Sequence, residues 1–382
     1  MVKIGTVLLL LLFFHNQQAY SLDAIGSTSD TMIATVGDAE PANLVPILRG
    51  TGQLGTQCFT DAACAPSLYC FACPAASELQ PKCTRKTATA TSTFPKNTSL
   101  PFNKYAWLTT HNSYAIFGST PQAGVPIITF FNQEDSVTDQ LNNGVRGLML
   151  DMYDFRNDIW LCHSFQGTCY EFTAFRPANK TLAEIKTFLD ANPNEVITIF
   201  IEDYVHAPNG ISRLFTNAGL MKYWMPVAMM PSNGKPWPTL REMIQRNHRL
   251  LVFTQDSTKE ATEGIAFQWR YTTENQYGDD GMRNGSCPKR NGTPAMSDVS
   301  RSLIVQNYFP TNPNPINACR DNSGGLFNML STCFAASGNR WSNYIALDFY
   351  KRSTGGGAFR ALDFLNGQME CDCQDISKSC SC

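Results

Sequence analysis

The sequence contains little charge and lacks any long apolar run. Lys, Arg, Asp and Glu make up 16% of the 382 residues, the formal net charge is −2, and there is no block of basic residues. A nucleic-acid partner is not expected, because binding one requires a basic patch or stripe. No stretch reaches the roughly 18 apolar residues that a transmembrane helix needs. The 43% hydrophobic content still predicts one large core with small appendages, and no obligate protein partner.

The N-terminus has the pattern of a secretory signal peptide. Lys3 precedes the short apolar run Val7 to Phe14, and Ala19 and Ser21 supply the small residues that signal peptidase accepts. Residues 1–21 are therefore interpreted as a signal, with an uncleaved anchor as the alternative. The last residues are polar and cysteine-rich, unlike the hydrophobic tail of a lipid-anchor signal. We expect a secreted or cell-surface protein.

The cysteines agree with export. There are fourteen, an even number, and most lie in the segment Cys58 to Cys83 or in the tail Cys371 to Cys382. In an oxidising compartment such clusters predict disulfides, with zinc binding at Cys70-x-x-Cys73 as the alternative. Acceptor sequences for N-glycosylation occur at Asn97, Asn179, Asn284 and Asn291.

Composition divides the chain into segments. The interpretation is a signal peptide at 1–21, an extended lead-in at 22–57, a Cys-rich module at 58–83, a Thr-rich linker at 84–100, one large domain at 101–365 and a Cys-rich tail at 366–382. The module is expected to cap the domain or to space it from a wall or membrane, with recognition of a lectin or protein type as the alternative.

Short apolar runs alternate with helical patterns in the large domain. The runs that predict buried strands are AWLTT, GLMLD, EVITIFIED, RLLVFTQD, SLIVQNYF and NYIALDFY. Ser136 with Asp139, and Thr181 with Glu184, stand at spacings that predict helix starts, and SRLFTNAGLMKYW predicts a third helix. The predicted fold class is α/β, a (β/α)8 TIM-type barrel of roughly 250 residues with a disulfide-rich N-terminal module and a Cys-rich tail. A doubly wound open sheet is the alternative, and the lack of Gly-x-Gly-x-x-Gly after the first strand counts against it.

Ionisable residues follow the predicted strands. His111-Asn112, Asp151, Glu202-Asp203, Asp256 and Asp348 end apolar runs, and His163 follows another. Since the carboxyl ends of barrel strands face one space, these residues are candidates for an active site. Two imidazoles suit a reaction that removes one proton from a nucleophile and delivers another to a leaving group, and phosphodiester cleavage is such a reaction.

The motifs LTTHNSY, GVRGLMLDMYD, WLCHSF and VITIFIEDY together resemble the catalytic X domain of phosphatidylinositol-specific phospholipase C, in a secreted plant-type branch. The resemblance covers about Pro101 to Leu365 and implies a barrel that cleaves inositol phospholipids. It implies that His111 deprotonates the inositol 2-hydroxyl, that His163 protonates the departing diacylglycerol oxygen, and that Asp348 orients the base. The expected partners are a phospholipid or phosphodiester substrate and a membrane surface.

The resemblance also implies a calcium site, from which this sequence departs. Asn112, Asp151 and Glu202 match three of four oxygen ligands, while Met149 stands where the family has an acid. A thioether is a poor ligand for calcium. The alternatives are weak calcium binding or a Lys or Arg from a later loop. Arg146 opens its strand and is expected to form a structural ion pair.

Two other functions remain open at this stage. One is a glycerophosphodiesterase or sphingomyelinase type of enzyme, which shares the barrel and the histidine pair. The other is a catalytically weakened cell-surface binding glycoprotein, which Met149 favours. Phe117, Phe130 and Phe131 lie in the loop after the first strand and predict contact with a lipid surface, with packing under the loop as the alternative.

Overall fold

The computed structural model describes residues 50–88 and 98–370. The expected signal peptide, most of the lead-in, the middle of the Thr-rich linker and the cysteines of the tail lie outside these residues. No helix within the described ranges has the length and apolarity needed to cross a membrane.

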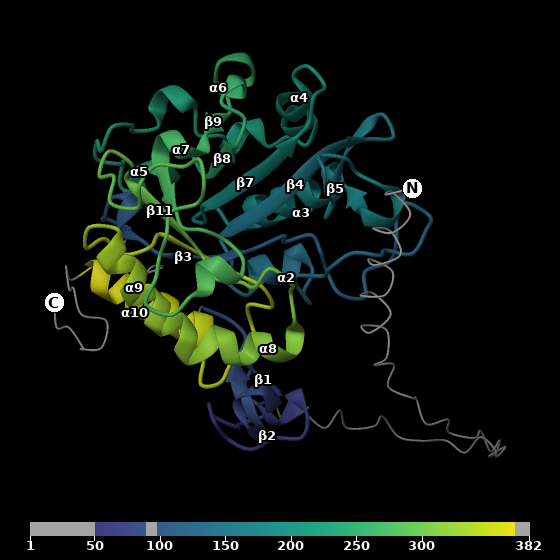
Figure 1. The fold of residues 1–382 in the computed structure, drawn as a ribbon, viewed down its shortest axis with the longest axis vertical. Helices are drawn as coiled ribbons and strands as arrows, with labels where there is room; N and C mark the ends of the chain where they lie inside the picture. Colours follow the sequence, from purple (N-terminus) through teal and green to yellow (C-terminus); the bar gives the residue numbers. More distant parts are fainter. Residues whose placement is uncertain (1–49, 89–97, 371–382) are drawn as a thin grey trace, which may run out of the picture. The chain divides into compact units, whose positions relative to one another are not determined.

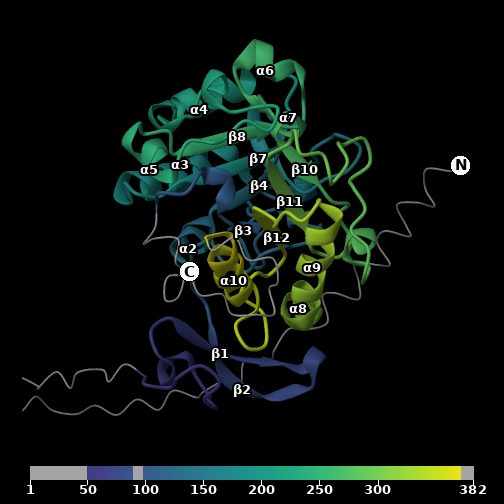
Figure 2. The same ribbon diagram turned by 90° about the vertical axis from the view of Figure 1, so that its left-hand side faces the viewer.

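Eight parallel strands form the main sheet, and β5 and β6 extend it as an antiparallel addition (Figures 1 and 2). The parallel order is β10-β11-β12-β3-β4-β7-β8-β9. The strands are β3 (Trp107–Thr110), β4 (Gly147–Phe155), β5 (Asp158–Cys162), β6 (Ala174–Pro177), β7 (Ile197–Tyr204), β8 (Leu250–Thr254), β9 (Ala266–Phe267), β10 (Thr272–Glu274), β11 (Leu303–Asn307) and β12 (Tyr344–Leu347). All six predicted strands are confirmed. The strand order confirms the (β/α)8-type barrel, with the short strands β9 and β10 at the two edges of the curled sheet.

Helices connect the parallel strands. They are α2 (Val137–Asn142), α3 (Ala178–Ala191), α4 (Gly210–Asn217), α5 (Leu240–Gln245), α6 (Thr258–Glu263), α7 (Gln268–Tyr271), α8 (Pro315–Arg320), α9 (Leu326–Ala336) and α10 (Gly357–Glu370), with the π-helical turn η8 (Asp321–Gly325) between α8 and α9. Ser136 caps α2 as predicted, because its hydroxyl accepts from the Asp139 amide at 3.0 Å. The predicted start at Thr181 is wrong, since α3 begins at Ala178 and buries Thr181.

Successive residues of the strands point to opposite faces of the sheet and pack into two different hydrophobic cores. Leu108 and Ile199 belong to the larger core, which packs against helices such as α3, while Trp107 and Phe200 belong to a second core. Successive side chains of a strand point to opposite faces, so a continuous apolar run buries both faces. The continuous runs in the sequence therefore identify strands covered on both sides.

The Cys-rich module is a two-stranded antiparallel hairpin of β1 (Leu68–Cys73) and β2 (Glu78–Arg85), near α8 in Figure 1. Residues 50–57, assigned to the lead-in from the sequence, hydrogen-bond to this hairpin, for example from the Gly55 amide to the Cys83 carbonyl at 2.9 Å. All ten cysteines in the described residues form disulfides, which confirms that prediction for them. Cys70 pairs with Cys58 and Cys73 with Cys319, so neither supplies a thiolate to zinc.

Candidate active site

A cavity of about 210 Å³ lies among the residues that follow the parallel strands. Five of the residues predicted from the sequence line it: His111, Asn112, Asp151, His163 and Glu202. Both histidines therefore face one cavity, although β3 and β5 carry them. Asp348, which follows β12, lies behind His111.

His111 is held by the carboxylate of Asp348. Its Nδ1 lies 2.9 Å from Asp348 Oδ1, and β12 is the strand hydrogen-bonded to β3, so the parallel pairing brings the two residues together. Asp348 is only 3% exposed. Its Oδ1 also accepts a hydrogen bond from Asn132 Nδ2 at 3.0 Å. A buried carboxylate on Nδ1 favours the tautomer whose Nε2 carries a lone pair, which a general base requires.

Phe309 fixes the orientation of the His111 ring from one face. The two rings are stacked with centroids 3.7 Å apart and an interplanar angle of 6°. Phe309 follows β11, the neighbour of β12, and is buried. The imidazole is therefore restrained both in its plane and at its Nδ1 atom.

His163 is held by a backbone carbonyl instead of a carboxylate. It follows β5, which pairs with the outer part of β4, and its Nδ1 lies 3.0 Å from the carbonyl oxygen of Phe130. Burial lowers the pKa of His163 below 6.5, and the neighbouring His111 lowers it further, against the raising effect of the Phe130 carbonyl. Burial therefore favours the neutral form of the His163 imidazole.

Asp151 and Glu202 lie side by side on β4 and β7, at paired positions of the ladder. Burial raises the pKa of Asp151 well above its usual range, and the adjacent Glu202 carboxylate raises it further. The Tyr204 hydroxyl donates to Glu202. Two acids this close in a buried site need a proton or a cation between them.

The oxygen-bearing side chains of Asn112, Asp151 and Glu202 are of the type that could hold a hard cation such as calcium. The end of the Asn112 amide lies 3.0 Å and 3.3 Å from the two carboxylate oxygens of Asp151. If the amide nitrogen of Asn112 faces Asp151, it donates a hydrogen bond to the Asp151 carboxylate. If the amide oxygen faces Asp151 instead, the oxygens of the two side chains lie about 3 Å apart, a spacing that suits neighbouring ligands of a hard cation. Met149 lines the same cavity and supplies no oxygen, so three of the four ligand positions expected from the family resemblance carry an oxygen-bearing side chain.

Among the residues that the structure describes, one lysine or arginine side chain lines this cavity, and it is that of Arg290. Its Nη1 lies 3.0 Å from Glu274 Oε1, and its guanidinium lies 4.9 Å from the ring centroid of Tyr277. Burial lowers the pKa of Arg290, but the carboxylates of Glu274 and Glu202 raise it by more, so the charge is retained. The sequence suggested a Lys or Arg from a later loop as one source of positive charge, and Arg290 is such a residue at the cavity.

Glu274 anchors this arginine. It is 2% exposed and accepts hydrogen bonds from Gln268, Trp269, Arg290 and Asn307. Sequence reasoning missed Glu274 and Arg290 because β10 is short and polar and Arg290 lies in a loop with no periodic pattern. Asn132 and Phe309 were missed as site residues as well, although Phe309 is the last residue of the predicted run SLIVQNYF.

Two ionisable residues at strand ends, and one that precedes a strand, have structural roles instead. Asp203 forms a buried ion pair with Lys259, 2.7 Å from Oδ1 to Nζ. Asp256 accepts hydrogen bonds from the amide and hydroxyl of Thr258 at the start of α6. Arg146 forms the expected structural ion pair, 2.7 Å from Glu195.

Aromatic and aliphatic side chains are exposed beside His163. Phe117, Ile128, Phe165 and Phe172 are 67%, 41%, 46% and 38% exposed. The Ile128 amide donates to the Phe172 carbonyl at 2.7 Å, which joins the two loops that carry these residues. Phe131, predicted as a lipid contact, instead packs edge-to-face on Phe175. We call Phe117, Ile128, Phe165 and Phe172 the apolar rim.

Comparisons with known proteins identify similar sequences and a similar solved structure. The sequence profile of the PI-PLC X domain family, described as PI-PLC X 1, matches residues 103–366. A PI-PLC X domain-containing protein of Arabidopsis thaliana is 52% identical over 329 residues, which are 86% of this chain and 77% of that protein. PI-PLC X domain-containing protein 1 of the fungus Arthroderma benhamiae is 27% identical over 260 residues, 62% of this chain and 79% of its own length. A solved phosphatidylinositol-specific phospholipase C from Listeria monocytogenes aligns with 71% of this chain and 94% of its own, at 15% identity and a TM-score of 0.44.

The chain belongs to the PI-PLC X domain family. The family and the barrel define a domain of the phospholipase C phosphodiesterase type.

Proposed function

We propose that this protein is an extracellular or cell-surface enzyme that cleaves phosphatidylinositol-type phospholipids into diacylglycerol and a cyclic inositol phosphate. The observation that carries the proposal is the histidine pair at one cavity, in which each Nδ1 is already engaged, by Asp348 or by the Phe130 carbonyl. The Nε2 atoms are then the ring atoms available for proton transfer. The disulfides support the location, because they persist in oxidising compartments.

In the proposed reaction His111 Nε2 removes the proton of the inositol 2-hydroxyl. The hydroxyl oxygen forms a bond to phosphorus while the bond from phosphorus to the diacylglycerol oxygen breaks. Protonated His163 gives its proton to that leaving oxygen. The reaction leaves His111 charged and His163 neutral, and a water molecule that reverses both roles opens the cyclic phosphate.

The charge that develops on the phosphoryl oxygens needs a cation. Arg290 supplies a permanent one, held in place by Glu274. Asn112, Asp151 and Glu202 would hold calcium, which would act as a Lewis acid on a phosphoryl oxygen. Met149 leaves the ligand set one acid short, so we propose that calcium binding is weak. Arg290 would then provide part of the positive charge that stabilises the phosphoryl oxygens.

The lining of the cavity favours an inositol ring without further phosphates. Asp151, Glu202 and Glu274 set three carboxylates against the single guanidinium of Arg290. Arg290 is the one basic side chain that lines the cavity among the described residues, and it is already paired with Glu274, so additional phosphate groups would find no further basic partner, whereas uncharged ring hydroxyls need none. Gln268 Oε1 and Asn307 Oδ1 are buried and accept no hydrogen bond within the described residues, so they suit the hydroxyl donors of a polyol.

The apolar rim supports contact with a lipid surface. Its exposed side chains stand on two loops that flank His163, and a lipid in the cavity would place its acyl chains outside it. Apolar and aromatic side chains partition into the boundary between lipid head groups and acyl chains. The rim would therefore bring the cavity to its substrate.

Release of diacylglycerol from phosphatidylinositol vesicles tests the proposal, with calcium or with chelator. We expect the wild-type protein to exceed both His111→Ala and His163→Ala by at least about 100-fold. His206 is an exposed histidine that does not line the cavity, so the control His206→Ala should match the wild type. Loss of turnover in chelator would assign the cation role to calcium, and persistence would assign it to Arg290. No turnover above His111→Ala in either condition would contradict the proposal and favour a binding glycoprotein.

A further inference from the structure

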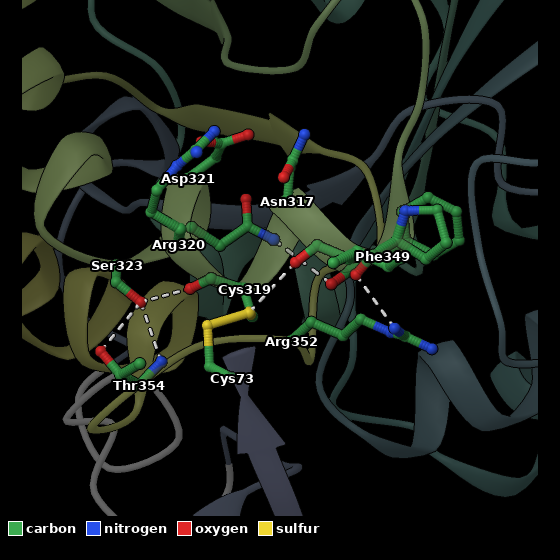
Figure 3. The surroundings of a disulfide bond; sticks show 12 residues. Cys73, Asn317, Cys319, Arg320, Asp321, Ser323, Phe349, Arg352 and Thr354 are labelled. Carbon is green, nitrogen blue, oxygen red and sulfur yellow. Dashed lines mark hydrogen bonds and ion pairs between the residues drawn. A yellow bond between two sulfur atoms is a disulfide. The ribbon is translucent and has the colours of Figure 1, made fainter. Parts of the chain in front are cut away.

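One disulfide joins the Cys-rich module to the barrel. Cys73, the last residue of β1, pairs with Cys319 of α8 across 246 residues of sequence (Figure 3). Of the other disulfides in the part of the chain that is described, two lie inside the module and two inside the barrel. Both cysteines of the connecting pair are 1% exposed. The link is therefore a buried covalent contact and not a surface tether.

Hydrogen bonds continue from this disulfide to the loop after β12. The Ser323 hydroxyl donates to the Cys319 carbonyl at 2.6 Å and accepts from the Thr354 amide at 2.8 Å (Figure 3). Ser323 lies in the π-helical turn η8 and has non-helical dihedral angles, φ −105° and ψ −121°. Such turns interrupt the regular ladder and re-aim the side chains beside them.

Asn322, in the same turn, reaches the residue that orients the base. Its side chain is 2% exposed, and its Nδ2 donates to the carbonyl oxygens of Asp348 at 3.0 Å and Phe349 at 3.2 Å. Phe349 has φ +45°, in the left-handed region that a bulky side chain rarely adopts. A chain turn of this kind needs outside support, and the two hydrogen bonds from Asn322 provide it directly behind the Asp348 carboxylate.

The module also contacts the following part of this loop. The Tyr69 hydroxyl donates to the Lys351 carbonyl at 3.0 Å, and the Arg352 guanidinium lies 5.7 Å from the ring centroid of Phe71. Arg352 in turn donates to the Pro315 carbonyl at the start of α8, at 2.9 Å. The loop that follows Asp348 is thus enclosed by the module on one side and by α8 and η8 on another.

We propose that the Cys-rich module and the Cys73–Cys319 disulfide form a brace that keeps Asp348 on His111, with Asn322 as a positioning residue. The module then serves the catalytic site and is not a separate recognition unit. The effect of the brace on catalysis rests on the proposed phosphodiesterase function. The geometry itself does not, since the contact between His111 and Asp348 can be measured without substrate.

The brace is tested by the tautomer of His111, read from the ring 15N chemical shifts of the histidine-labelled full chain near pH 8. The wild type should show the proton on Nδ1, where Asp348 accepts it. Cys73→Ser with Cys319→Ser, and separately Asn322→Ala, should shift the ring toward the Nε2–H form that predominates in free imidazole. The matched controls are Cys287→Ser with Cys333→Ser, and Asn317→Ala on the partly exposed side of α8; both should retain the wild-type signal.

Turnover of a soluble inositol phosphodiester gives the second measurement. The two test variants should lose about 10–100-fold in kcat with KM nearly unchanged, since misplacement of a catalytic group affects the chemical step. An unchanged His111 tautomer in both test variants would overturn the brace. If the double cysteine variant does not fold, Asn322→Ala alone decides. A shifted tautomer in a protein that shows no turnover even as wild type would support the brace and refute the proposed function.

Discussion

The ring of Phe309 lies flat on the ring of His111, with centroids 3.7 Å apart. The hydrogen bond from His111 Nδ1 to Asp348 alone would let the imidazole tilt, and the stacking contact with Phe309 restrains that tilt. The two restraints come from residues that follow β11 and β12, so His111, the proposed general base, is positioned by three adjacent strands, its own included.

Phe309→Leu should therefore lower kcat. Leucine keeps the apolar character but not the flat surface, so the ring gains freedom and we expect a loss of about 10-fold with the fold retained. Phe334→Leu is the matched control, because Phe334 packs on Trp341 with centroids 4.2 Å apart in another part of the barrel. Steady-state turnover of phosphatidylinositol measures both. Equal losses in the two variants would mean that the stack on His111 has no special role.

Asp348→Asn should nearly abolish turnover. The amide is isosteric but carries no charge to stabilise the imidazolium and favours the wrong tautomer, so a loss of roughly 10²–10⁴-fold is expected. Asp256→Asn provides the contrast, since this strand-end carboxylate only caps the start of α6. It should keep its activity and nearly all of its free energy of unfolding, because the amide oxygen of asparagine can accept the same hydrogen bonds from Thr258. Full activity in Asp348→Asn would remove Asp348 from the mechanism.

The value of kcat/KM should decrease as pH rises, because the proposed general acid His163 loses its proton. His163 must carry a proton to act as the acid, and burial lowers the pKa of His163 below 6.5. The protonated fraction therefore falls as pH rises through this lowered value, and kcat/KM for a soluble substrate should fall with it. His206→Ala should leave the profile unchanged. An alkaline limb that begins well above pH 6.5 would show that another group supplies the proton.

Vesicle binding should depend on the apolar rim. Changing Phe117 and Phe165 together to Ser removes two of its exposed rings, and we expect vesicle affinity to fall by about 10-fold, since lipid contact scales with buried apolar area. Phe59 and Leu79 are 86% and 73% exposed on the Cys-rich module and provide a matched pair for substitution. Sedimentation with phosphatidylinositol vesicles measures the binding. An equal loss from the control pair would indicate non-specific adhesion.

The sequence predicts the long strands and the residues at their ends, because β3, β4, β7, β8, β11 and β12 are continuous apolar runs. It does not predict β9 and β10, which contain two and three residues. Glu274 lies in β10 and Arg290 in the loop after it. The sequence therefore did not predict these two charged residues of the cavity. The direction of loop side chains is equally hidden: Phe131 turns inward onto Phe175, while Phe165 and Phe172 are exposed.

Pairing between distant segments follows from topology and not from local pattern. His111 and Asp348 each follow an apolar run, and only the parallel order of β3 and β12 makes them neighbours. The disulfide from Cys73 to Cys319 has no signal in the spacing of the cysteines. The start of α3 was misplaced because Thr181 and Glu184 match a cap by spacing, although Ala178 already lies in the helix.

The division of labour between the two histidines is tested most directly by changing the leaving group. An inositol nitrophenyl phosphodiester needs no protonation of its leaving oxygen, whereas a phosphodiester with an alkyl leaving group does. His163→Ala should lose at least about 100-fold on the alkyl substrate and little on the nitrophenyl substrate, while His111→Ala should lose similarly on both. Equal losses for the two variants on both substrates, or no loss in either, would contradict the assignment of His111 as base and His163 as acid.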